Sequence, residues 1–145
     1  YSSAASDVYK RQILNRFLNS NPSASLEKVA TCEDIISMKE EAKKVFIHPV
    51  LIDYIVELAR MTREEENVSI GVSPRGTLGM LNAVRAFAYV SGREYVVPED
   101  IKTLAPYVWA HRLVLQNGFI NRDNKEQIIE NVVAKTTVPT EDWTK

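Results

Sequence analysis

The residues best suited to chemistry lie in one short stretch, GVSPRGTL at residues 71–78. Ser73 can accept hydrogen bonds from the free N–H groups of a helix start, and proline, here Pro74, is favoured at the first helical position. Arg75 is then the second helical residue, where its charge opposes the helix dipole by roughly 0.3–1 kcal/mol. Two interpretations follow. Arg75 contacts an anion from elsewhere, with phosphate as the leading candidate, or it is a solvated surface arginine.

The helix that begins with this stretch is predicted to be the central element. It should run from Ser73 to about residue 91, with Gly92 placed to end it. Apolar residues occupy much of its circumference, which is typical of a helix inside a domain. Gly76 and Gly79 each cost roughly 1 kcal/mol relative to alanine in a helix interior, so they indicate close approach by a neighbour or a ligand. Gly71 is expected to give the preceding loop conformational freedom.

Further helices are predicted on both sides of the central one. Helical spacing and start signals indicate helices at 13–18, 31–44, 49–62, 98–104 and 106–115, and the polar segment 121–124 leads into a last helix that contains 128–133. Thr31 and Asp34 form a weak capping box, and Pro106 is expected to divide two short helices. Residues 45–47 and 95–97 are brief β-prone runs that could pair in parallel. The pattern predicts a mainly all-α fold, a helical bundle with at most two very short β-strands.

Length and composition predict one cytoplasmic domain. The 145 residues suffice for one core, and a formal net charge of −1 gives no overall attraction to nucleic acid or acidic membranes. No apolar run reaches the ~20 residues needed to span a bilayer. We interpret residues 1–12 as an extension outside the fold, either translated adapter sequence or a natural flexible terminus. The domain is expected at 13–140, followed by a tail at 141–145.

For the other candidate residues, a structural role is an alternative to a functional one. His48 and His111 lack neighbouring ligands at metal spacing, so we predict no metal site and structural roles for both histidines. Cys32 stands alone, without a base that would activate it. Tyr107 and Trp109 could stack on a base, although such residues more often pack a bundle. No phosphate-binding loop of the form GxxxxGK followed by Ser or Thr occurs, so the chain holds no complete nucleotide-hydrolysing site.

Several motifs together resemble a known family. The stretch at 71–78, the segment GREYVVPEDI at 92–101, and the residues from Leu104-Ala105-Pro106 to His111-Arg112-Leu113 occur in the order found in the C-terminal lid domain of MoxR-family AAA+ ATPases. The segments 45–63 and 13–29 are also similar to that family. The resemblance covers most of residues 13–140. Gly76 departs from it, because the family more often has alanine there.

The resemblance implies a specific function. The lid is an α-helical bundle beside the nucleotide, and the arginine matching Arg75 is the sensor 2 residue, which reaches the terminal phosphates of ATP. Ser73 and Pro74 would hold the helix start beside the nucleotide. ATP and Mg²⁺ would be bound mainly by an upstream AAA+ core, so this chain alone should be inactive. The family also implies a cytoplasmic homo-oligomeric ring, usually a hexamer, with chaperone-like assembly activity and von Willebrand factor A-domain partners.

Two other interpretations stay open at this point. A free-standing helical interaction domain could bind a partner helix in a groove. A helical nucleic-acid-binding module could use Arg75, Arg85, Arg93 and Arg112 as phosphate contacts, although the acidic balance counts against it. The lid interpretation predicts no nucleic-acid partner and no membrane span. The sequence does not name a client protein.

Overall fold

The computed structural model describes residues 3–19, 26–116 and 122–140. Backbone contacts divide the chain into two compact units, residues 1–35 and 36–145. The limits expected from the sequence, 1–12, 13–140 and 141–145, stay predictions, and the tail at 141–145 lies outside the described residues. No helix within the described ranges is both long and apolar enough to cross a membrane.

The first unit contains helix α1 (Ser3–Asn19) and the start of α2 (Cys32–Lys44). The sequence predicts no regular continuation from residues 1–12 into the next segment, whereas α1 runs through both. The backbone hydrogen bonds of an α-helix join residues four apart and require no apolar stripe, so the lack of periodicity in this segment did not exclude a helix. The capping box is confirmed: the Asp34 N–H donates to Thr31 Oγ1 over 3.0 Å, and the Thr31 N–H donates to Asp34 Oδ2 over 2.7 Å. These bonds lower the pKa of Asp34.

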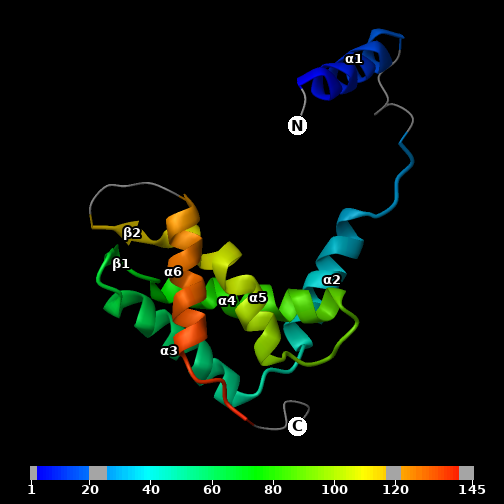
Figure 1. Cartoon of the computed structure of the whole chain (residues 1–145). Coiled ribbons are helices and arrows are strands. Elements are labelled where there is room, and N and C mark those ends of the chain that lie inside the picture. Colours follow the sequence, from blue (N-terminus) through cyan, green and yellow to red (C-terminus); the bar gives the residue numbers. More distant parts are fainter. Residues whose placement is uncertain (1–2, 20–25, 117–121, 141–145) are drawn as a thin grey trace. The chain divides into compact units, whose positions relative to one another are not determined.

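The second unit is built around four helices, α3 (Pro49–Glu64), α4 (Pro74–Val90), α5 (Pro98–Trp109) and α6 (Arg122–Lys135). Helix α4 packs against α3 and α5, and α6 packs against the same two helices, which closes a bundle (Figure 1). Large side chains buried in its core come from all four helices and the segment after α5: Leu51, Leu58, Met80, Val84, Ile101, Trp109, Leu113, Ile129 and Val132. The predicted fold class, mainly helical with a token of β structure, is confirmed.

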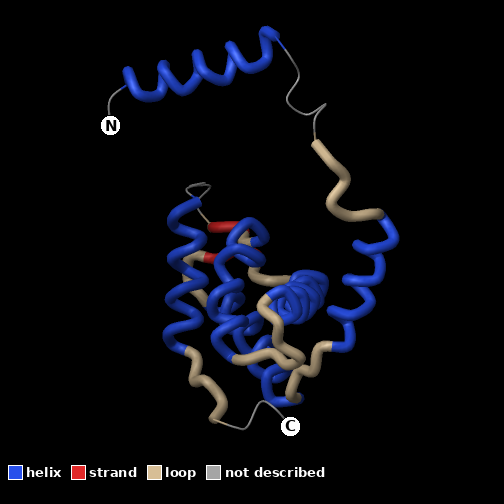
Figure 2. Tube along the Cα trace, turned by 90° about the vertical axis from the view of Figure 1, so that its right-hand side faces the viewer, coloured by secondary structure: helices blue, strands red, loops and turns tan. Residues whose placement is uncertain are grey.

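The β structure lies partly where the sequence predicts it and partly elsewhere. Phe46 and Tyr95 form an isolated parallel bridge, in which the Phe46 N–H donates to Glu94 O over 2.8 Å. The named strands are β1 (Val68–Ile70) and β2 (Val114–Leu115), which pair antiparallel (Figure 2). These two strands were not predicted. At three and two residues they are too short to show a period, and they pair because the fold brings two distant connections together.

The prediction of two helices divided at Pro106 is wrong. Helix α5 continues through Pro106 to Trp109, and a 3₁₀ turn, η2 (Ala110–Arg112), follows it. The proline removes one backbone donor, but Ile101, Ala105 and Trp109 share one face and are fully buried. Burial of that face outweighs the cost of one lost hydrogen bond. The predicted second helix therefore ends at residue 109, and residues 114–115 form β2 instead.

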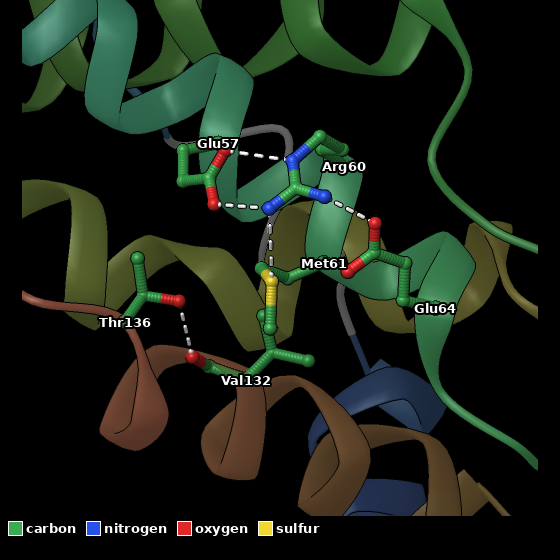
Figure 3. Close-up of polar contacts among 6 residues, drawn as sticks. All are labelled: Glu57, Arg60, Met61, Glu64, Val132 and Thr136. Carbon is green, nitrogen blue, oxygen red and sulfur yellow. Dashed lines mark hydrogen bonds and ion pairs between the residues drawn. The ribbon is translucent and has the colours of Figure 1, made fainter.

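The outer surface of α3 carries a network of charged side chains, shown in Figure 3. Arg60 donates through Nε and Nη2 to the Glu57 carboxylate over 2.8 and 2.6 Å, and it also pairs with Glu64. This pairing raises the pKa of Arg60 and lowers that of Glu57. At the end of α6, the Thr136 hydroxyl donates to Val132 O over 2.8 Å. Exposed pairs of this kind contribute little to stability, so Arg60 is a suitable control residue.

Candidate functional site

The start of α4 has the geometry that the sequence predicts. Ser73 is the N-cap in extended backbone, and its Oγ accepts a hydrogen bond from the Gly76 N–H over 3.3 Å. Pro74 occupies the first helical position. The helix ends as predicted too, because Gly92 has φ of 72° and the Arg93 N–H donates to Ala88 O over 2.9 Å. Both ends of this helix are therefore fixed by local sequence.

Arg75 is exposed at the second position of α4. Its guanidinium makes no hydrogen bond or ion pair with any side chain in the described part of the chain. It therefore lies at the positive end of the helix dipole without a protein carboxylate to offset its charge. A guanidinium in this position can offer forked N–H donors to the oxygens of an external anion.

The loop before Arg75 is anchored by a buried hydroxyl on α3. Thr62 is fully buried, its Oγ1 donates to Ala59 O over 2.7 Å, and the same oxygen accepts from the Val72 N–H over 3.0 Å. Gly71 lies against this anchor, since a Cβ there would come within 2.6 Å of Arg63 Cγ and 2.9 Å of Arg63 N. Gly71 does not have a positive φ. Its role is therefore to allow close approach, rather than the conformational freedom expected from the sequence.

We expect Thr62→Val to destabilise the fold by about 1–3 kcal/mol, because it leaves the buried Val72 N–H without an acceptor. Thr62→Ser keeps the hydroxyl and should preserve that bond. Urea unfolding measures the free energy of each variant, and amide exchange at Val72 identifies the cause. Fast exchange at Val72 in the valine variant and slow exchange in the serine variant is the expected result. Equal exchange in both would contradict the anchor.

On its other side, the first turn of α4 contacts the end of α5 and η2. Buried Trp109 donates through Nε1 to Gly76 O over 3.0 Å. The Arg112 side chain lies along α4, so that a Cβ on Gly76 would meet Arg112 Cδ at 3.2 Å and Val72 Cγ1 at 2.9 Å. Gly76 therefore permits a close approach, as predicted, and the neighbours are Val72 and Arg112. At Gly79 the approach is looser, with Arg112 Nη2 at 3.9 Å.

The two glycines should respond oppositely to alanine. Gly79→Ala meets only ordinary contact and should stabilise the protein by about 0.5–1 kcal/mol through helix propensity. Gly76→Ala must displace the buried Val72, which costs roughly 1–3 kcal/mol and outweighs the same propensity gain. We expect a net loss of about 1 kcal/mol in urea unfolding. If both variants shift stability in the same direction, the packing of Arg112 and Val72 described above is incorrect.

The four arginines suggested as nucleic-acid contacts do not form one surface of free cations. Arg93 donates two hydrogen bonds of 2.8 and 2.6 Å to the carboxylate of buried Asp100, and it also donates to Tyr95 O over 3.0 Å. These contacts raise the pKa of Arg93. Arg112 donates through Nε to Val108 O over 3.3 Å. Arg75 is exposed, whereas Nε of Arg85 is buried.

The remaining candidates have structural surroundings. His48 caps α3 by accepting from the Val50 N–H through Nδ1 over 3.3 Å, whereas His111 lies exposed in η2. Cys32 is exposed at the start of α2. Trp109 belongs to the core and cannot stack on a ligand, while Tyr107 is exposed. Among the residues that the structure describes, no three His, Cys, Asp or Glu side chains cluster as a metal site.

Next to the start of α4, an apolar groove of about 380 Å³ runs between α3 and α4. Its walls include Ile52 and Val56 from α3, and Pro74 and Leu78 from α4. Arg63 lies among the lining residues. The groove thus begins at the residue before Arg75, and several of its apolar side chains are exposed.

The helices around the start of α4 match a known family of domains. A family model described as the AAA lid domain matches residues 60–132, about half of the chain. This chain belongs to the AAA lid domain family. The match includes the Thr62 anchor, the whole of α4 and the end of α5. The lid thus contains the residues that position Arg75.

Relatives place the lid among the MoxR-type AAA+ proteins. Chaperone MoxR1 of Mycobacterium tuberculosis is 33% identical over 136 residues, which are 88% of this chain and 36% of the relative. Protein YeaC of Bacillus subtilis, described as uncharacterized, is 35% identical over 121 residues, 83% of this chain and 38% of its own length. This chain thus contains a lid domain of the MoxR-family AAA+ ATPase type, and it spans less than two fifths of these two relatives.

A solved structure agrees with the assignment. A protein from Cytophaga hutchinsonii, described as a candidate ATPase, matches with a TM-score of 0.76 and 27% identity. The match covers 90% of this chain and 43% of that protein. The lid fold therefore occurs there as part of a longer polypeptide.

The sequence predicts Arg75, Ser73 and Pro74 as site residues, but it does not predict the residues that hold them in place. Thr62 is a polar residue one turn after Leu58, on the buried face of α3. That position was the available signal, since a buried threonine must find hydrogen-bond partners. Trp109 and Arg112 gave no local signal, because they approach α4 only in the folded bundle.

Proposed function

We propose that this lid responds to the phosphates of ATP bound to an adjoining AAA+ core, with Arg75 as the sensor 2 residue. One observation carries the proposal: Arg75 is an exposed arginine without an acidic partner in the described residues, on a helix start that is anchored from both sides. Ser73 and Pro74 fix the helix start, so the Arg75 side chain extends from a fixed backbone position. Pre-positioned donors of this kind stabilise charge without reorganising during reaction.

ATP hydrolysis is what such an arginine would assist. Charge on the transferring phosphoryl group spreads over its outer oxygens, and a forked guanidinium stabilises that charge. ATP and Mg²⁺ would be held mainly by the core. When the γ-phosphate leaves, the guanidinium loses its partner, so the position of the lid would depend on the nucleotide state.

The wider role follows from the relatives. One of them is named as a chaperone, which supports remodelling or assembly of other proteins. We propose that this machine works in the cytoplasm. We propose a homo-oligomeric ring, a hexamer by analogy with the family, and von Willebrand factor A-domain proteins as partners. Nucleic acid is not among the proposed partners, because Arg93 is held by Asp100 and the net charge is −1.

The experiment that tests the lid role compares this chain with the longer protein that includes it. The 145-residue chain alone should hydrolyse no ATP and should show no saturable ATP binding at millimolar concentration, because one arginine without a phosphate loop offers little preorganised binding. The longer protein should hydrolyse ATP and should bind it saturably. Hydrolysis by the isolated chain would overturn the proposal. Salt-sensitive binding of the isolated chain to duplex DNA would favour the nucleic-acid alternative instead.

A further inference from the structure

A second arginine, Arg112, lies along the face of α4 that carries Arg75. Arg112 belongs to η2, and the hydrogen bond from Trp109 Nε1 to Gly76 O holds the end of α5 against the first turn of α4. The Arg112 stem crosses Gly76, because a Cβ there would meet Arg112 Cδ at 3.2 Å. Its guanidinium lies over Gly79, with Nη2 3.9 Å from the position of a Cβ. Two helix positions without side chains therefore make room for Arg112.

The Arg112 guanidinium is close enough to Arg75 for one anion to meet both. Gly79 follows Arg75 by four residues in α4, and residues with this spacing are neighbours on a helix surface. Their Cβ positions are about 5–6 Å apart, so Arg112 Nη2 lies within about 10 Å of Arg75 Cβ. Both arginine side chains are exposed. A ligand at this face can therefore reach either guanidinium.

The two arginines carry charge that the described part of the chain does not offset. Neither has a carboxylate partner among the described residues. Arg112 donates through Nε to Val108 O over 3.3 Å, and no acceptor for its Nη1 or Nη2 occurs within the described ranges. The bond at Nε orients the guanidinium, while its outer edge keeps two parallel N–H donors. Two cations at this separation repel each other, which favours an anion between them.

We propose that Arg112 contacts the γ-phosphate of ATP alongside Arg75. This inference rests on the proposed function, because an adjoining AAA+ core would supply the nucleotide. A terminal phosphate carries about two negative charges near neutral pH and presents three oxygens, which suits two forked cations. A carboxylate carries a single charge and would leave one of the two arginines without compensation. The pair therefore favours phosphate over an acidic side chain.

Arg112 is expected to act mainly on nucleotide affinity. Its bond to Val108 O and its packing on Gly76 hold the side chain in place without a ligand. A contact that is equally strong in the ground state and the transition state changes affinity and leaves kcat almost unchanged. The expected effect thus differs from that of Arg75, which is assigned to charge that develops during the reaction.

The test measures equilibrium binding of a non-hydrolysable ATP analogue and of ADP to the longer protein that includes this lid and its core. Arg112→Gln removes the charge and the fork, but its amide can still donate to Val108 O. We expect analogue affinity to fall about tenfold or more, with ADP affinity within about twofold and kcat within about threefold of wild type. The loss should shrink between about 0.1 and 1 M salt, where the Debye length falls from about 10 to 3 Å.

Two matched variants accompany Arg112→Gln. Arg112→Lys keeps the charge without the fork, so it should recover part of the affinity. Arg60→Ala on the outer surface of α3 should change neither affinity by more than about twofold. Unchanged analogue affinity in Arg112→Gln would overturn the proposal. An equal loss for ADP and the analogue would also overturn it, because the effect would then not depend on the γ-phosphate.

The same measurements separate this proposal from the sensor assignment. Weak analogue binding in Arg112→Gln, together with normal turnover in Arg75→Ala, would support the Arg112 contact and reject the sensor role of Arg75. Normal analogue binding in Arg112→Gln, together with lost turnover in Arg75→Ala, would reject the Arg112 contact and leave the sensor role intact.

Discussion

Replacing Arg75 with alanine is expected to lower ATP turnover about 100-fold in the protein that carries this lid together with its nucleotide-binding core. Removal of one preorganised donor that stabilises transition-state charge typically has an effect of this size. The loss should appear in kcat, since the contact strengthens as charge develops on the transferring group. Steady-state hydrolysis at saturating ATP measures it.

Two matched variants separate this effect from a general loss of positive charge. Arg75→Lys keeps the charge but loses the fork, so it should recover only part of the rate. Arg60→Ala removes an exposed arginine of α3 that pairs with Glu57 and Glu64, and it should leave turnover within about twofold of wild type. If Arg75→Ala also stays within twofold, with unchanged nucleotide affinity, the sensor assignment is wrong.

The largest effect on stability is expected for Asp100→Ala. Asp100 accepts both hydrogen bonds from Arg93 and a third from the Val97 N–H over 3.0 Å, and its side chain is only 4% exposed. Breaking a buried ion pair at one partner typically costs 3–5 kcal/mol. About 3 kcal/mol is expected here, because the Arg93 side chain is 27% exposed and can regain some water.

The control for this variant is the neighbouring residue on the same helix turn. Glu99 pairs with Lys102 at 3.6 Å and its side chain is 69% exposed, so Glu99→Ala should cost less than about 1 kcal/mol. Urea unfolding of both variants gives the comparison. Similar free energies of unfolding for the two variants would contradict a special role for the Arg93–Asp100 pair.

Local sequence was sufficient to predict α4 and its two ends. The Ser73 cap, Pro74 and the Gly92 stop act within a few residues of the backbone groups they serve, so they can be read without knowledge of the fold. The Thr31 capping box was predictable for the same reason. Arg75 could be placed at the second helical position because it follows from the cap.

Other features depended on tertiary contacts and were missed. Pro106 is tolerated inside α5 because the face formed by Ile101, Ala105 and Trp109 is buried, and no local rule states that. The strands β1 and β2 exist only because two connections meet. The supports of the site act over distance as well, since Thr62 lies 10 residues from Val72 and Trp109 lies 33 from Gly76.

The glycines separate what local sequence can predict from what depends on tertiary packing. The cost of Gly76 inside a helix indicated a close neighbour, and the structure identifies Val72 and Arg112 in that place. Gly71 suggested conformational freedom, but its surroundings require the absence of a side chain instead. In both cases the sequence could indicate a constraint, while only the packing of α3, α4 and η2 identifies its cause.

The most direct test of the sensor assignment is a structure of the longer protein with a non-hydrolysable ATP analogue. The account predicts an Arg75 guanidinium nitrogen within about 3 Å of a γ-phosphate oxygen, a normal hydrogen-bond distance. With ADP in place of the analogue, that contact should be absent. An Arg75 side chain that remains in solvent, or that pairs with a carboxylate while the γ-phosphate is bound, would contradict the account.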